Sequence, residues 1–190
     1  HTNVDTTVAG QVTITGTEAE IRSALADLTL VPGTHLDTDI TLGVAVTVRD
    51  TDGDAAGDSA TQTFTGTHTI AVAAVADAPS VGATARGNED APIGLEITAT
   101  LTDTDGSETF THADVIVPTG VTIAATSLPL GVTQSTIAGG VRFTFDPAVM
   151  TTAQVQAFLA NNITVQASGD SNVDFDVTVT IGTKETTLSG

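Results

Sequence analysis

Two stretches of the chain follow the same pattern, and this internal repeat constrains the fold more than any other feature. The first, VTITGTEAEIRSALADLTLVPGTHLDTDITLGVAVTVRD, runs from Val12 to Asp50. The second, FTFDPAVMTTAQVQAFLANNITVQASGDSNVDFDVTVTIG, runs from Phe143 to Gly182. Corresponding positions lie 134 residues apart, which is the size of a whole domain. The repeat therefore indicates a tandem array of domains rather than a solenoid of small units.

Each copy contains the start signal of a short helix. Thr17 with Glu20, and Thr151 with Gln154, form the pattern of a capping box, in which hydroxyl and side-chain oxygen each accept from a backbone N–H of the other residue. Apolar residues follow at helical spacing: Ile21, Ala24, Leu25 and Leu28 in the first copy, and Val155, Phe158 and Leu159 in the second. We expect a helix of one to two turns in each copy.

The rest of the pattern predicts strands. The apolar residues are mainly Val, Ile, Leu and Ala, set among many Thr, and the branched side chains of Val, Ile and Thr favour the pleated surface of a sheet. Alternation predicts strands near residues 11–15, 28–32, 40–49 and 62–75, and then near 80–85, 93–101, 110–117, 120–125, 141–145, 162–166 and 174–182. Short strands with regular turns favour an all-β fold of tandem Greek-key β-sandwich units, immunoglobulin- or cadherin-like, with one short helical turn each.

The position of the repeat within the chain predicts the domain boundaries. Residues 1–78 correspond to the C-terminal part of a first sandwich unit, and residues 79–190 to a second unit that lacks the last strand of the first. We expect a half-sandwich with an open edge to be unstable by itself.

Charge excludes several classes of partner. Five Lys and Arg stand against 23 Asp and Glu, a formal net charge of −18. Nucleic acids and anionic lipids require clustered cations, so neither is expected as a partner, and no apolar stretch is long enough for membrane insertion. The chain has no Cys, so an extracellular protein of this type needs another cross-link, for which calcium between carboxylates is the obvious choice.

Two acidic turns are the candidate metal sites. DTDGSE spans residues 103–108, and DTDGDAAGD spans residues 50–58. Alternate Asp residues, a Gly that permits a sharp turn and a carboxylate that can chelate are features of calcium loops. The antiparallel strand directions bring the first turn back to the linker at Asp77. The predicted ligands are Asp77, Asp103, Asp105 and Glu108 at this junction, and Asp50, Asp52 and Asp54 in the second turn.

A plain solvated turn is the alternative to metal binding, because Asp-Gly is a common turn signal. The convergence of Asp77 with the turn at 103–108 favours a cation over water at the junction. For residues 50–58 the two interpretations stay open.

The quoted patterns also resemble a known family. VADAPSV at the linker, NEDAPIGLEITATLTDTDGSETF, a strand ending in VPTGVTI, and the closing DVTVTIG resemble the cadherin-like or VCBS-type repeats of giant RTX adhesins of Gram-negative bacteria. The resemblance implies type I secretion to the cell surface, calcium at domain junctions and adjacent repeats of the same chain as partners. It also implies a spacer role that holds ligand-binding domains away from the cell during adhesion and biofilm formation. The shortened first unit departs from that pattern, or marks a domain split by an inserted module.

Three classes of function can be compared on this basis. An enzyme is not expected, because His35, His68 and His112 belong to no nucleophile or zinc motif, and no Trp or Tyr is present to stack on a sugar. A module that binds a sugar or peptide is the main alternative, although such sites usually use aromatic anchors. A rigid calcium-dependent spacer agrees best with the sequence, with any host or surface ligand bound by other domains.

Overall fold

The structure of the protein is a computed structural model that describes residues 3–7, 9–51, 59–88, 90–103, 105–169 and 173–186. The chain divides into two compact units, residues 1–34 and residues 35–190. No helix among the described residues is long and apolar enough to cross a membrane.

The first unit contains two short strands and one helix. Strand β1 (Asn3–Asp5) pairs antiparallel with β2 (Thr13–Thr15), and helix α1 (Glu18–Ala26) follows. Thr17 caps the helix with both hydrogen bonds of the predicted capping box. However, α1 buries none of its residues, and Leu25 remains 53% exposed.

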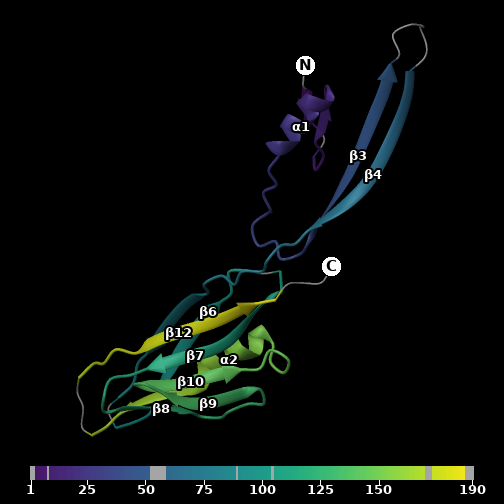
Figure 1. Ribbon diagram of the computed structural model, residues 1–190. Helices are drawn as coiled ribbons and strands as arrows, with labels where there is room; N and C mark the ends of the chain where they lie inside the picture. The colour runs from purple at the N-terminus through teal and green to yellow at the C-terminus, as the bar shows by residue number, and fades with distance from the viewer. Residues whose placement is uncertain are drawn as a thin grey trace. The chain divides into compact units, whose positions relative to one another are not determined.

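The second unit contains a long hairpin and a sandwich (Figure 1). The hairpin is made of β3 (Ile40–Thr51) and β4 (Ser59–Ile70). The sandwich elements are β5 (Ser80–Ala85), β6 (Ile93–Thr100), β7 (Glu108–Ile116), β8 (Val121–Ala125), β9 (Val132–Ile137), β10 (Gly140–Phe145), α2 (Thr152–Asn161), β11 (Ile163–Ala167) and β12 (Thr178–Glu185).

Two four-stranded antiparallel sheets form the sandwich. Their strand orders are β12-β7-β10-β9 and β5-β6-β11-β8. Both sheets and α2 contribute to one core, with Phe143 of β10, Ile97 of β6, Ile163 of β11 and Leu159 of α2 at 0 to 1% exposure. The rings of Phe143 and Phe145 meet Phe158 edge to face at centroid distances of 5.4 and 6.0 Å. The all-β prediction is confirmed at the level of two antiparallel sheets around a shared core.

The hairpin pairs over its whole length but has an uncovered apolar face. Twelve residue pairs join β3 to β4, from Ile40 opposite Ile70 to Thr51 opposite Ser59. Residues opposite each other share a face, so Val46 and Phe64 lie together, at 50% and 65% exposure. On the other face the hydroxyl groups of Thr47 and Thr63 lie 2.9 Å apart.

The repeat explains where the structure differs from the predicted strands. The predicted strand at 28–32 is wrong, because these residues form no strand, whereas the corresponding β11 is held between β6 and β8. Among the described residues before residue 28, the strands are β1 and β2, which pair with each other and not with residues 28–32. Strands β1 and β9 were not predicted; β9 reads VTQSTI, whose largely polar pattern gave no alternation signal.

The last strand begins later than predicted but keeps its predicted alternation. β12 starts at Thr178 rather than near 174, and Phe175, Val177 and Val179 are partly buried against the core, with Ile181 buried at 7% exposure. The capping box at Thr151 is also present, and α2 buries Val155, Phe158 and Leu159 as predicted.

Candidate metal site

The acidic turn at 103–108 connects β6 of one sheet to β7 of the other. The Oδ1 atom of Asp103 accepts from the backbone N–H of Asp105 at 2.9 Å. The Oδ1 atom of Asp105 accepts from the N–H and the hydroxyl of Ser107 at 2.8 and 2.6 Å. Gly106 has φ of 99°, a backbone conformation that favours glycine. Each of the two Asp side chains therefore accepts a hydrogen bond from the backbone two residues further on, and these bonds stabilise the turn locally.

The linker before β5 lies against this turn. The backbone N–H of Asp77 donates to Oε1 of Glu108 at 3.0 Å, and the Asp77 carbonyl accepts from the hydroxyl of Thr183 on β12 at 3.0 Å. The carbonyl of Ala78 accepts from the hydroxyl of Thr102 at 2.8 Å. These bonds fix Asp77 between the start of β7 and the end of β12.

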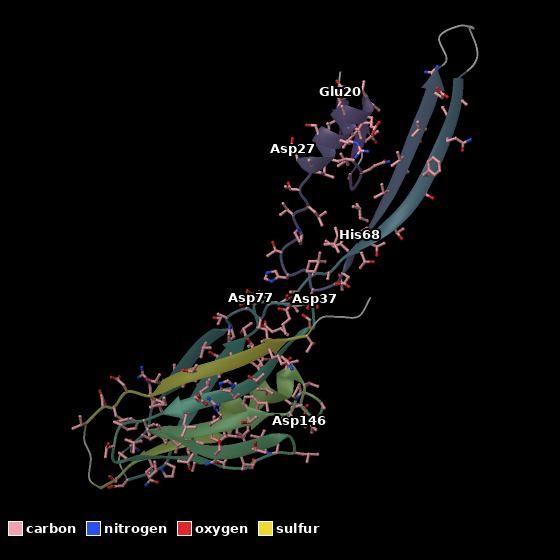
Figure 2. The ribbon with its side chains drawn as sticks, in the orientation of Figure 1. Glu20, Asp27, Asp37, His68, Asp77 and Asp146 are labelled. Carbon is pink, nitrogen blue, oxygen red and sulfur yellow. The ribbon has the colours of Figure 1, made fainter. Side chains whose placement is uncertain are left out.

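The segment before β3 brings further acids and a histidine to the same place. Nδ1 of His35 lies 2.9 Å from Oδ2 of Asp77 and 3.5 Å from Oδ2 of Asp103. Asp37 is only 3% exposed, and Asp39 accepts from the N–H of Val72 at 3.1 Å. Figure 2 labels Asp37 and Asp77 in these connecting segments.

We call this group the junction cluster. It consists of His35, Asp37, Asp77, Asp103, Asp105, Glu108 and Glu185.

Two carboxylates of the junction cluster are buried with one oxygen unsatisfied. Asp103 is 5% exposed and Glu108 is 2% exposed. Oδ2 of Asp103 and Oε2 of Glu108 are closed to solvent and have no hydrogen-bond partner in the part of the chain that the structure describes. Nδ1 of His35 lies 3.5 Å from Oδ2 of Asp103, which is too far for a good hydrogen bond. Buried ionised oxygens without partners are costly, so such atoms point to a bound cation or a proton.

Repulsion between carboxylates affects Glu185, the last residue of β12. Burial raises the pKa of its carboxyl, and the neighbouring charges of Asp103, Asp37 and Asp105 raise it further, while a hydrogen bond from Ser107 opposes them. The hydrogen bonds from Ser107 lower the pKa of Asp105, so that this carboxylate stays charged. The junction cluster therefore concentrates negative charge that the protein's own hydrogen bonds compensate only in part.

The structure brings together four of the seven predicted ligands. Asp77, Asp103, Asp105 and Glu108 meet at the linker, as the strand directions predicted. Asp50 does not join them: it lies ten residues along β3 from Ile40, a distance of about 33 Å at the rise of a strand. Asp52 and Asp54 lie outside the described residues, so the metal prediction for that turn stays a prediction.

Sequence analysis missed three members of the junction cluster. His35 belongs to no metal motif of the sequence, and Asp37 and Glu185 lie outside the two acidic turns that predict the ligands. Asp37 carried a usable signal, because HLDTD repeats the alternation of DTDGSE directly before a predicted strand. Glu185 and His35 join the site through pairing and backbone conformation, which no local pattern predicts.

The junction cluster gathers carboxylate oxygens and one imidazole nitrogen, which are groups that can hold a cation. Comparison with known proteins adds no assignment: no family model, no curated protein and no solved structure matches the chain.

Proposed function

We propose that this chain is a calcium-stabilised structural extender module of a large repetitive bacterial surface adhesin. In this role it stiffens an array of similar sandwiches at the cell surface and projects ligand-binding domains for adhesion and biofilm formation. The adhesin class rests on the resemblance of the linker and acidic turn to RTX adhesin repeats. The calcium dependence rests on the geometry of the junction cluster.

The observation that carries the calcium proposal is the pair of buried oxygens without partners on Asp103 and Glu108. Calcium takes six to eight oxygen ligands from carboxylates, carbonyls and water. Asp77, Asp103, Asp105 and Glu108 would hold it, with Asp37 and Glu185 adding negative charge nearby. The ion would supply the positive charge that these carboxylates lack.

The position of the junction cluster explains how a cation would stiffen the protein. The cluster joins four segments: the approach to β3, the linker at Asp77, the turn before β7 and the end of β12. Two unit charges 4 Å apart interact by roughly 4 kcal/mol at an effective dielectric of 20. Without a cation this repulsion separates the segments, and with one they are held together.

The internal repeat supports the view that residues 1–78 are the C-terminal part of another sandwich. β3 corresponds to β12, whose apolar side chains pack on a core, whereas Leu42, Val44, Val46 and Val48 of β3 are 40 to 55% exposed. The apolar face of β3 is thus the face that a complete sandwich covers.

Calorimetric titration of the chelator-treated protein with calcium tests the proposal most directly, combined with small-angle scattering in calcium and in chelator. We expect at least one calcium ion to bind and the maximum dimension to change when it is removed. Absence of binding, or an unchanged scattering profile in spite of binding, contradicts the extender mechanism.

A ligand-binding module is the second candidate, and one observation favours it. A groove of about 490 Å³ lies between the acidic turn and α2, lined among others by Phe110, Phe145, Met150 and Val155 with Asp103 and Glu108. An apolar groove with acids at one side could take a sugar or peptide. Chemical-shift changes confined to this groove on addition of glycans or peptides would favour this function over the spacer.

A further inference from the structure

The junction cluster contains a nitrogen ligand that a calcium site does not need. His35, Asp77 and Asp103 each offer one ligand atom, and these three atoms all lie within 4.8 Å of one another. They come from three separate segments: the approach to β3, the linker before β5, and the turn after β6. Imidazole nitrogen is a preferred ligand of first-row transition metals, whereas calcium prefers oxygen.

The two distances from Nδ1 of His35 match the separation of ligands on a small metal ion. His35 Nδ1 lies 2.9 Å from Asp77 Oδ2 and 3.5 Å from Asp103 Oδ2. Zinc binds nitrogen and oxygen at about 2.1 Å, so two ligands on one ion are separated by roughly 3.0 Å in octahedral and roughly 3.4 Å in tetrahedral geometry. The observed separations bracket these values, so little movement is required to admit an ion.

The described residues leave one atom of this group unsatisfied. Asp103 is 5% exposed, and its Oδ2 has no hydrogen-bond partner among them, although Nδ1 of His35 lies 3.5 Å away. His35 adopts φ of 59°, which is rare for a residue other than glycine. In this backbone conformation its ring lies beside Asp77. A divalent cation would pair Oδ2 of Asp103 and use Nδ1 of His35 as a ligand at the same time.

We propose that His35, Asp77 and Asp103 form a site for a transition-metal dication of the zinc type, which completes its coordination with water. The proposal rests on the same cluster as the calcium function and deepens it, because Asp77 and Asp103 are common to both sites. The two cations therefore compete, and the metal that holds the linker depends on which one is available.

The test uses the full chain freed of metal by chelation, with zinc as the probe and calorimetry as the readout. His35→Asn removes the imidazole but retains a residue type that tolerates positive φ. His68→Asn is the matched control, because His68 is an exposed histidine on β4 of the same unit. A His1→Ala background removes a further imidazole, outside the described residues, that could bind zinc independently.

We expect one zinc ion per chain, at least tenfold weaker binding in His35→Asn, unchanged binding in His68→Asn, and a lower apparent zinc affinity in millimolar calcium. Cobalt as a second probe should give the visible absorption of a nitrogen-containing site in the parent but not in His35→Asn. Equal zinc binding by the parent and His35→Asn overturns the proposal. Calcium binding without zinc binding overturns this inference alone, whereas loss of both overturns the proposed function as well.

Discussion

The backbone N–H of Asp77 donates a hydrogen bond to Oε1 of Glu108 at 3.0 Å, across 31 residues of sequence. This bond joins the linker to the first residue of β7 and leaves Oε2 of the same carboxylate buried without a partner. One oxygen of Glu108 thus positions the linker, whereas the other requires a cation or a proton. This division allows the two roles of Glu108 to be separated by mutation.

Glu108→Gln should retain the hydrogen bond to Asp77 and remove the buried charge. In chelator, we expect the free energy of unfolding to rise by about 1 to 3 kcal/mol, because an unpaired buried charge is lost. In calcium, we expect most of the metal-dependent rise in Tm to disappear. Asp176→Asn is the control, because it removes one exposed charge outside the junction cluster. It should change neither the free energy of unfolding in chelator nor the calcium-dependent rise in Tm. Calcium stabilisation equal to that of the parent would remove Glu108 from the site.

Asp105→Asn should weaken calcium binding without unfolding the turn. The amide oxygen can still accept from Ser107, as Oδ1 of Asp105 does now. Because the side chain is exposed, we expect metal-free stability to change by less than about 0.5 kcal/mol. We expect calcium affinity, measured by calorimetry, to fall roughly tenfold. An unchanged affinity would show that the carboxylate of Asp105 does not contribute to cation binding.

Leu159→Ala and Leu25→Ala form a matched pair, because the two leucines occupy the same position after the capping Thr of each repeat. Leu159 is 0% exposed, so its truncation should cost about 2 to 5 kcal/mol in urea denaturation. Leu25 is 53% exposed, so its truncation should cost less than about 1 kcal/mol. A similar cost at both positions would show that α1 is packed as tightly as α2.

The ion pair between Asp114 and Arg142 predicts a pH dependence. Arg142 donates from Nε and one Nη to the two oxygens of Asp114 at 2.6 and 2.7 Å, and these hydrogen bonds lower the pKa of Asp114 below its ordinary 3.8. As the pH falls, Asp114 therefore binds a proton in the unfolded state before it does so in the folded state. The stabilisation is complete above about pH 4 to 5 and is lost as the pH falls through the lower pKa of the folded state.

Arg142→Met should accordingly cost about 1 kcal/mol at pH 7, because Arg142 is partly exposed and water screens the pair. The difference from the parent should vanish in urea denaturation near pH 2. A difference that stays constant between pH 7 and pH 2 would mean that Arg142 acts through packing of its alkyl chain.

Hydrogen exchange should distinguish the hairpin from the sandwich. The amides of β3 and β4 are paired, but both strands are exposed along one apolar face. We expect them to exchange with a lower opening free energy than the amides of β7, which lies between β12 and β10 above the core. Equal protection of the pair Val46 and Phe64 and of Val115 would indicate that the hairpin is covered in solution, for example by a second copy.

The sequence predicted the features that depend on neighbouring residues. The capping boxes at Thr17 and Thr151 formed because their hydrogen bonds span only three residues. The alternation from Phe175 to Ile181 correctly predicted which side chains face the core, because the period of two belongs to the strand itself. The convergence of Asp77 with Asp103 followed from the antiparallel strand directions alone.

Only the tertiary structure decided what depends on distant partners. Residues 28–32 carry the pattern of a strand but form none, because a strand requires neighbours to pair with. Leu25 and Leu159 have the same local signal and opposite burial, because one helix has a core beneath it and the other does not. His35 became a candidate ligand through a backbone conformation and two contacts that link residues 42 and 68 positions apart. Local pattern determines which structure a segment can form, but free energy from long-range packing and pairing determines whether it forms.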